Sequence, residues 1–329
     1  MPPAVSAADA RVNRYVAASL RQTSRAKYAR EFARYCASTE RSGHAPLPVT
    51  PAKLARYVTE RAEEAGSATS VEQWLAQVQG HARRAGTLEM TAAGQQHLAI
   101  VTSGLGNVLG RDYKQRAVIN GEMLRVVAVM AAPAIAADPF LQLVWSHTLV
   151  AYHYLLRPNE HTGESRARLG HMLQGSAAPG APLPVSLRLF DTKGTRRANL
   201  GPSAFETVYA YGGPGQDLDF TAPLALWVQR YGCGAEDLLF PGWDAATARP
   251  SRTTMSAPAY NEALGRLMRL GGFTSSLTAQ GLRAGRRTDL SEAGVPEPTI
   301  NRLGRWKSAS ASERYNRLSA NVLRGTAGI

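Results

Sequence analysis

Apolar side chains recur at helical spacing through the first hundred residues of the chain. Tyr28, Phe32 and Tyr35 follow one another at intervals of four and three, which places them on one face of an α-helix that Thr23 or Ser24 can cap. The same periodicity predicts three further helices, over residues 50–65, 70–85 and 91–109. We therefore expect an all-helical domain, because these apolar faces can be buried against one another.

The apolar pattern breaks at the charged segment GRDYKQRAVING, residues 110–121. A chain of 329 residues is long enough for two domains, so we place the boundary in this segment. The predicted order is a loose tail over residues 1–10, a helical domain over 11–110, a linker over 111–121 and a second domain over 122–329.

The second domain combines helices with one clear strand pattern. Apolar and polar residues alternate over residues 185–190, and the sequence DTKG at 191–194 predicts a turn after them. Periodicity predicts helices over residues 122–132, 138–156, 257–270, 278–293, 298–303 and 308–318. We expect the second of these helices to end at Arg157-Pro158, since the residue before a proline avoids helical backbone. The expected fold class is mainly α, with a small antiparallel sheet in an α+β second domain.

Basic side chains dominate the charge of the chain. Lys and Arg total 38 against 25 Asp and Glu, a formal net charge of +13, and only five of the basic residues are lysines. Guanidinium groups bind phosphate through paired hydrogen bonds, so this excess favours a phosphate-rich polymer as partner, although a solvated basic surface has the same composition. Four basic residues share the first predicted helix and form a candidate DNA-binding surface: Arg25, Lys27, Arg30 and Arg34.

Several classes of protein are excluded by what the sequence lacks. Two cysteines, Cys36 and Cys233, cannot build a disulfide scaffold or a cysteine-rich zinc site. The most apolar segment, residues 141–156, is interrupted by Gln, Ser and His and does not predict a membrane span, and the start of the chain has no secretory signal pattern. Motifs for P-loops, serine hydrolases and zinc proteases are absent, as is a carboxylate cluster for two metal ions. We therefore expect no metal and no nucleotide cofactor.

A set of polar and aromatic residues in the second domain occurs in a distinctive order. Seven of them stand as follows: Arg157 and Glu160 in LLRPNE, Lys193 in DTKG, Gln280 and Arg283 in TAQGLRAG, Trp306 in LGRWKS, and Tyr315 in SERYNR. Through these residues the chain resembles the tyrosine recombinases, or phage integrases. That family has Arg-x-x-Glu after an apolar helix, Lys in a β-hairpin, His-x-x-Arg on a helix, and His or Trp nine residues before Tyr. Trp306 and Tyr315 have this separation.

The resemblance implies a SAM-like, core-binding domain followed by a catalytic domain. It implies an enzyme that cleaves and rejoins DNA through a 3′-phosphotyrosyl link, in site-specific recombination, integration or transposition of a mobile element. The partners would be double-stranded DNA and a homo-tetramer on two duplexes, with no membrane, metal or nucleotide cofactor. The location would be intracellular, in a bacterial cytoplasm or nucleoid or in a eukaryotic nucleus.

The residue types suit transfer of a phosphoryl group from a DNA strand to a tyrosine. Arg157 and Arg283 can bind both non-bridging oxygens of a phosphodiester and stabilise the charge that builds up during attack. Tyr315 supplies a hydroxyl nucleophile. Lys193 can protonate the leaving 5′ oxygen. Two residues assist: the indole N–H of Trp306 can donate to the phosphate, and Glu160, one turn from the first arginine, can orient a guanidinium.

Gln280 departs from the family pattern, because it stands where the family usually has His. A glutamine amide can donate a hydrogen bond to a phosphate oxygen but cannot carry a proton between groups. The general base would then be water, Lys193 or another histidine, such as His161 or His171.

Two other functions use similar residues. A type IB topoisomerase has nearly the same Arg, Lys, Arg and Tyr set, although a compact helical domain ahead of a short catalytic domain favours a recombinase. Gln280 favours a DNA-binding regulator or a domesticated transposon remnant that does not cleave DNA efficiently. The retained Tyr315 favours an enzyme, since DNA binding alone requires no tyrosine there.

Overall fold

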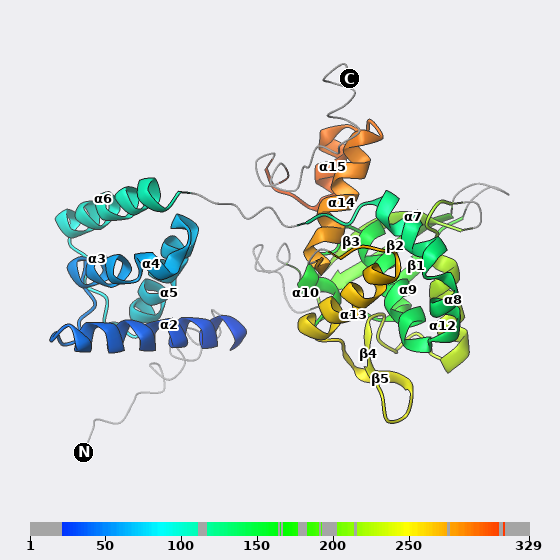
Figure 1. The fold of residues 1–329 in the computed structure, drawn as a ribbon, viewed down its shortest axis with the longest axis horizontal. Coiled ribbons are helices and arrows are strands. Elements are labelled where there is room, and N and C mark those ends of the chain that lie inside the picture. Colours follow the sequence, from blue (N-terminus) through cyan, green and yellow to red (C-terminus); the bar gives the residue numbers. More distant parts are fainter. Residues whose placement is uncertain are drawn as a thin grey trace. The chain divides into compact units, whose positions relative to one another are not determined.

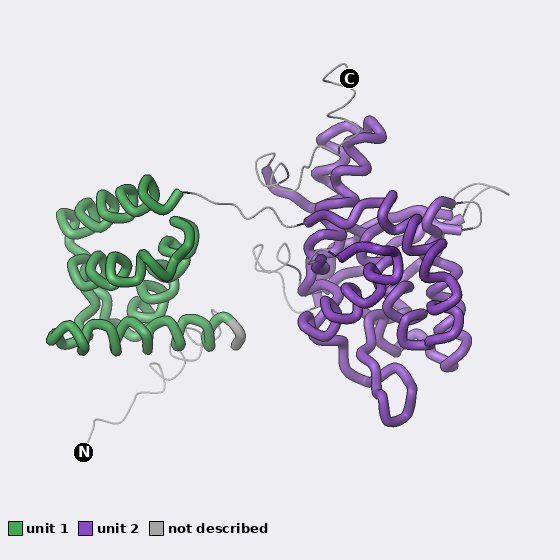
Figure 2. The backbone as a smooth tube through the Cα atoms, in the orientation of Figure 1, with its two compact units in different colours: residues 1–114 green, residues 115–329 purple. Residues whose placement is uncertain are grey.

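The structure, a computed structural model, describes residues 22–110, 117–163, 165, 167–176, 183–190, 192, 203–213, 216–274, 277–308 and 312. The chain folds as two parts, Met1–Lys114 and Gln115–Ile329, hereafter unit 1 and unit 2 (Figure 2). No helix within the described ranges is both long enough and apolar enough to cross a membrane.

Unit 1 is built from helices that surround one apolar core (Figure 1). Two of them begin as the sequence predicts, because the hydroxyl groups of Thr50 and Thr91 accept hydrogen bonds from the first turns that follow them. The helices are α2 (Gln22–Arg41), α3 (Pro51–Glu60), α4 (Ala62–Ala65), α5 (Ala68–Arg84) and α6 (Ala92–Leu109).

The single helix predicted over residues 50–65 is wrong, because the chain leaves helical geometry at Arg61, between α3 and α4. The Arg61 guanidinium lies 3.8 Å from the centroid of the Trp74 ring and forms an ion pair with the buried Glu31 of α2. The Tyr57 hydroxyl donates to the same carboxylate at 2.5 Å. Glu31 and Trp74 belong to other helices, so local periodicity carries no sign of the break.

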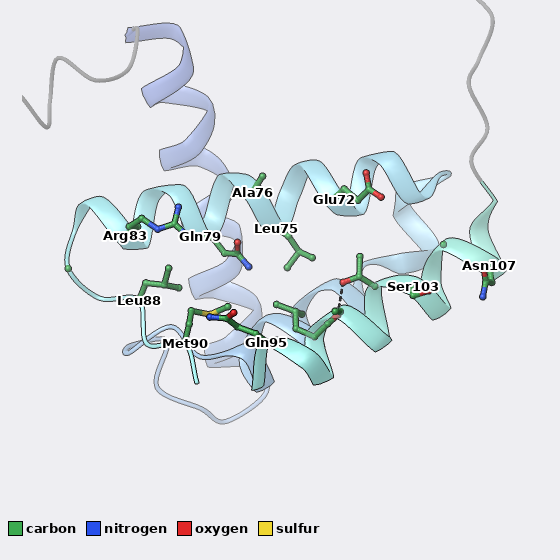
Figure 3. A pocket seen from close by; sticks show the side chains of 15 residues that line it. Glu72, Leu75, Ala76, Gln79, Arg83, Leu88, Met90, Gln95, Ser103 and Asn107 are labelled. Atoms are coloured by element: carbon green, nitrogen blue, oxygen red, sulfur yellow. Dashed lines mark hydrogen bonds between the residues drawn. The ribbon is translucent and has the colours of Figure 1, made fainter. Parts of the chain in front are cut away.

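A groove runs between α5 and α6 of unit 1 (Figure 3). Its volume is about 1250 Å³, and apolar and amide side chains such as Leu75, Gln79 and Gln95 line it. The lining contains one carboxylate, Glu72, and one guanidinium, Arg83. The two charges balance, so the lining of the groove carries no net charge.

Unit 2 is mainly helical and contains small antiparallel sheets, so the predicted fold class is confirmed. Its helices are α7 (Gly121–Met130), α8 (Ala132–Ala137), α9 (Pro139–His153), α10 (Pro158–His161), the 3-10 helix η1 (Leu169–His171), α12 (Thr221–Tyr231), α13 (Ala257–Leu270), α14 (Ala279–Glu292) and α15 (Glu297–Gly304). Its strands are β1 (Met172–Gln174), β2 (Leu183–Phe190), β3 (Phe205–Gly212), β4 (Pro241–Asp244) and β5 (Arg249–Thr254).

Helix α9 lies at the centre of unit 2, in contact with α8, α12, α13 and α14 (Figure 1). Twelve of its fifteen residues are buried, which suits a helix that is covered on all sides. The helix starts at the predicted Asp138 cap, but it ends at His153, before the predicted stop at Arg157-Pro158. The chain turns at Leu155, which has a left-handed φ of 48°, and Pro158 instead begins α10. A left-handed leucine has no sequence signal, so the prediction was three residues too long.

The larger sheet has the order β1-β2-β3, and every pair is antiparallel. Its alternation is as predicted, because Val185, Leu187 and Leu189 of β2 are all buried. Phe190 pairs with Phe205, so the connection between β2 and β3 covers residues 191–204 and is longer than the predicted four-residue turn. Lys193 lies within this connection, outside the described residues.

The first described residues of unit 2 pack against α14. The N–H of Ile119 donates to the carbonyl of Gly281 at 3.1 Å, and the N–H of Gly121 donates to Asp289 Oδ2 at 2.8 Å. A Cβ at Gly281 would lie 2.7 Å from the carbonyl of Ala117, and one at Gly285 would overlap Ile119. Residues 117–121, which the sequence assigns to the linker, are therefore part of unit 2.

Candidate active site

Arg157 and Glu160 lie together at the start of α10. Glu160 Oε2 accepts the backbone N–H of Arg157 at 2.8 Å, and Oε1 accepts Nη1 of the same residue at 2.7 Å. The carboxylate caps the first turn of the helix and holds the guanidinium at the same time. Glu160 is buried, whereas the Arg157 side chain is 20% exposed and so remains accessible to a ligand.

Arg283 lies on α14 and is almost completely buried. Its two terminal nitrogens donate to the carbonyls of Leu155 and Gly304. The left-handed backbone of Leu155 belongs to the same turn that ends α9. A guanidinium from α14 therefore fixes two chain segments that lie far apart in the sequence, the end of α9 and the end of α15.

Trp306 follows α15, and its half-buried ring packs on the Arg283 guanidinium, 4.3 Å from ring centroid to Cζ. This contact depends on the glycine at position 304, because a Cβ there would overlap the six-membered part of the indole ring. The glycine of the motif LGRW therefore provides the space that the Trp306 ring occupies.

Arg305 is a site residue that we did not single out from the sequence. It caps α15 with a left-handed φ of 57°, and its side chain is 10% exposed. Nη2 donates to Glu160 Oε2 at 2.8 Å and to the carbonyl of Leu155 at 3.2 Å. Its own carbonyl accepts Nη2 of Arg157 at 3.0 Å. The only sequence signal is its place directly before Trp306.

Positive charge exceeds negative charge at this site. Arg157, Arg283 and Arg305 face two carboxylates: Glu160, and Glu206, which lies 3.8 Å from Nη1 of Arg305. Burial by itself would raise the pKa of Glu160, but the charges of Arg305 and Arg157 hold it below its usual value. The carboxylate is ionised, and the remaining positive charge suits an anionic ligand.

Gln280 lies on α14 one turn before Arg283, so both side chains lie on the same side of the helix. One turn beyond Arg283, the buried Arg287 donates from Nε to the hydroxyl of Ser312 at 3.0 Å. Ser312 is buried and precedes Tyr315 by three residues. Tyr315 itself lies outside the described residues.

Of the two histidines suggested as bases, His161 lies in the core and His171 lies on η1. His161 is fully buried, and its Nδ1 lies 2.8 Å from Nε2 of His147 inside the core. Burial lowers its pKa to about 3, so it cannot serve as a base at a phosphate group. His171 accepts the backbone N–H of Arg168 at 3.1 Å and packs on Phe190, near the end of β2 that leads toward Lys193.

The candidate DNA-binding residues of α2 are all exposed, but they do not share one side of the helix. At about 100° per residue, Lys27, Arg30 and Arg34 fall within about 60° of one another, and Arg25 lies at least about 140° away from each. Arg41, also exposed, falls within the same sector as the first three. Lys27, Arg30, Arg34 and Arg41 form one basic stripe, hereafter the α2 stripe.

Comparisons with known proteins identify the fold. No protein-family model and no curated protein matches the sequence. A lambda integrase dimer bound to a COC′ core site matches at a TM-score of 0.56, with 14% identity over 93% of each chain. The Tn1549 transposon integrase in complex with transposon right end DNA matches at 0.55, with 13% identity over 97% of this chain and 96% of that one. The XerH site-specific recombinase bound to a palindromic difH substrate matches at 0.54, with 13% identity over 85% of this chain and 72% of that one. The chain has the fold of these recombinases.

Proposed function

We propose that the protein is a site-specific DNA recombinase that cleaves and rejoins strands through a 3′-phosphotyrosyl intermediate. The observation that carries this proposal is that Arg157, Arg283 and Trp306, from three separate segments, are joined through Arg305 and the carbonyl of Leu155, with the buried Glu160 carboxylate holding Arg157 and Arg305. The fold shared with DNA-bound tyrosine recombinases supports it.

The reaction is a phosphoryl transfer in two steps. The hydroxyl oxygen of Tyr315 attacks the phosphorus, loses its proton to a base, and forms a bond as the bond to the 5′ oxygen breaks. Lys193 protonates that 5′ oxygen, and Arg157 and Arg283 stabilise the charge on the two non-bridging oxygens. Attack by a 5′ hydroxyl reverses the step. The phosphotyrosyl link conserves the energy of the broken bond, so no nucleotide is consumed.

The surrounding residues assign supporting roles. Glu160 orients Arg157, and the Trp306 ring holds the plane of Arg283. Gln280 donates a neutral hydrogen bond to the phosphate. Ser312, which precedes Tyr315 by three residues in the sequence, is fixed to α14 by Arg287.

Double-stranded DNA is the proposed partner. Unit 1 would contact the backbone through the α2 stripe, whose exposed guanidinium and ammonium groups suit phosphate rather than base edges. Four copies on two duplexes are the proposed assembly. One structural relative, a lambda integrase tetramer bound to a Holliday junction, matches at a TM-score of 0.52.

The decisive experiment looks for the covalent adduct. A duplex is first selected from a random-sequence library by binding to the full chain, and a nick is then placed near the cleavage position so that cleavage traps the enzyme. We expect a protease-sensitive adduct with the parent and none with Tyr315→Phe, although both bind the duplex equally. Tyr211→Phe, on exposed β3, is the matched control.

The outcomes separate the alternatives. An adduct from Tyr315→Phe at parental yield rules out this nucleophile. Tight binding by the parent without any adduct identifies a DNA-binding regulator, the function that Gln280 favours. Efficient relaxation of a supercoiled plasmid that lacks the selected site identifies a topoisomerase.

A further inference from the structure

Arg305 occupies a backbone position that normally suits glycine. It is the residue directly after α15, with a φ of 57° and a ψ of 40°. A side chain in this left-handed region is strained, and glycine is the usual residue at such a helix end. An arginine with a nearly buried side chain is therefore retained here against a local preference.

The contacts of Arg305 connect both candidate phosphate-binding arginines. Arg305 holds Arg157 in two ways. Its carbonyl accepts a hydrogen bond from Nη2 of Arg157, and its guanidinium donates to the Glu160 carboxylate, which in turn accepts Nη1 of Arg157. Toward Arg283 it shares an acceptor, since both guanidinium groups donate to the carbonyl of Leu155.

The hydrogen bonds of the side chain single out Glu160 rather than Glu206. Nη2 lies 2.8 Å from Glu160, whereas Nη1 lies 3.8 Å from Glu206, which is too long for a hydrogen bond. Within the described part of the chain, Nε and Nη1 of Arg305 are buried without a hydrogen-bond partner. The shortest contact of the side chain is therefore the one with Glu160.

We propose that Arg305 is a positioning residue for DNA cleavage, which holds the Glu160 carboxylate aligned so that Arg157 is fixed in place. Its role in cleavage rests on the proposed function, whereas its effect on Glu160 does not. Arg305 faces the carboxylates of Glu160 and Glu206 and the guanidinium groups of Arg157 and Arg283, so its removal leaves Glu160 with fewer positive neighbours.

The first test uses Arg305→Gly, because glycine suits the left-handed backbone and removes only the side chain. We expect single-turnover cleavage at pH 7 to fall by about tenfold to a hundredfold, the cost of a misplaced reacting group, with unchanged DNA affinity. The rate of the variant should rise toward higher pH as Glu160 ionises, and Arg305→Lys should restore part of it. The matched control is Ala248→Gly, which also has a left-handed φ, of 51°, but lies between β4 and β5.

The second test asks whether Arg305 acts through Glu160. Glu160→Gln imitates a protonated carboxyl, so adding Arg305→Gly to it should slow cleavage much less than Arg305→Gly slows the parent. Full additivity of the two losses overturns the inference. So does a parental rate and pH profile for Arg305→Gly, or a loss of DNA affinity at an unchanged rate.

The third test requires no cleavage. The carboxyl carbon-13 resonance of Glu160, assigned with Glu160→Gln, is titrated in the parent and in Arg305→Gly. We expect the pKa of Glu160 to rise in the variant. If the pKa of Glu160 rises in the variant but the parent does not cleave DNA, the contact between Arg305 and Glu160 stands and the recombinase proposal is refuted. If the parent cleaves DNA and the pKa of Glu160 does not rise in the variant, the role of Arg305 is refuted.

Discussion

The guanidinium of Arg283 lies 4.3 Å from the centroid of the Trp306 ring, and the residue that permits this contact is Gly304. The ring covers one face of the guanidinium plane, while the carbonyls of Leu155 and Gly304 hold its edge. An arginine constrained on both its face and its edge keeps its direction when a phosphate arrives, which is the property that electrostatic catalysis requires.

Gly304→Ala should displace Trp306 from Arg283, because the added Cβ overlaps the indole ring. We expect a loss of about 1–3 kcal/mol in the free energy of unfolding from overpacking, and slower cleavage of a nicked duplex. Gly265→Ala on α13 is the control, since its Cβ meets only the end of the Arg269 side chain, at 3.4 Å. Equal rates for the two variants would show that the ring position does not matter.

Under the proposed function, Arg157→Lys and Arg283→Lys should both lower single-turnover cleavage by about 10² or more, because each guanidinium would stabilise charge on the phosphate. Arg283→Lys should lower the free energy of unfolding more than Arg157→Lys, since Arg283 is almost completely buried and holds the carbonyls of Leu155 and Gly304, whereas the Arg157 side chain is 20% exposed. Urea unfolding and adduct formation are measured on the same preparations. If the variants bind DNA more weakly but cleave it at an unchanged rate, both arginines only bind DNA and do not stabilise the transition state.

Gln280→His should raise the cleavage or ligation rate near pH 7, where an imidazole is partly protonated. The gain is at most about 10²–10⁴, the usual contribution of general acid–base catalysis. Gln280→Ala should slow the reaction less than loss of either arginine, because it removes one neutral hydrogen bond. Single-turnover rates over about pH 6–9 compare the three proteins. A histidine variant no faster than the parent would place the base elsewhere, with His171 the next to test.

Replacing Lys27, Arg30, Arg34 and Arg41 by glutamine should reduce the slope of log affinity against log salt concentration by about 3–4, near 0.9 for each phosphate contact. Arg25→Gln alone should leave the slope nearly unchanged, because Arg25 points to a different side of α2. Titrations at several salt concentrations give both slopes. An unaltered slope in the fourfold variant would move the DNA contact to another surface.

The free energy of unfolding should fall as the pH drops from about 6.5 to about 4. His153 is buried, its Nε2 lies 2.8 Å from the carbonyl of Leu218, and burial lowers its pKa to about 4. In this pH range the unfolded chain binds a proton that the folded chain does not, so stability is lost on acidification, by up to about 3 kcal/mol. His153→Phe should reduce the dependence of the free energy of unfolding on pH, measured by urea unfolding, whereas the exposed His44→Gln should not.

The sequence predicted correctly those helix bounds, caps and strand patterns that depend on neighbouring residues. The bounds of α13 agree with the periodicity of residues 257–270, and the cap at Asp138 and the alternation in β2 are present. Glu160 lies beside Arg157 because a spacing of three residues at a helix start brings a carboxylate back to the preceding N–H.

Features with distant causes were missed. Strands β4 and β5 contain proline, glycine and charged residues, and they pair with each other without an apolar alternation to reveal them. The end of α9 and the role of Arg305 both depend on the carbonyl of Leu155, which receives guanidinium groups from residues more than a hundred positions later. No window of sequence contains both partners.

The packing of residues 117–121 on α14 has a mechanical consequence. Ile119 and Gly121 are tied to this helix by hydrogen bonds, and the glycines at 281 and 285 leave no space between the two segments. The start of unit 2 is thus fixed to α14, the helix that bears Gln280 and Arg283. A displacement of Ile119 or Gly121 along the backbone would therefore act directly on this helix.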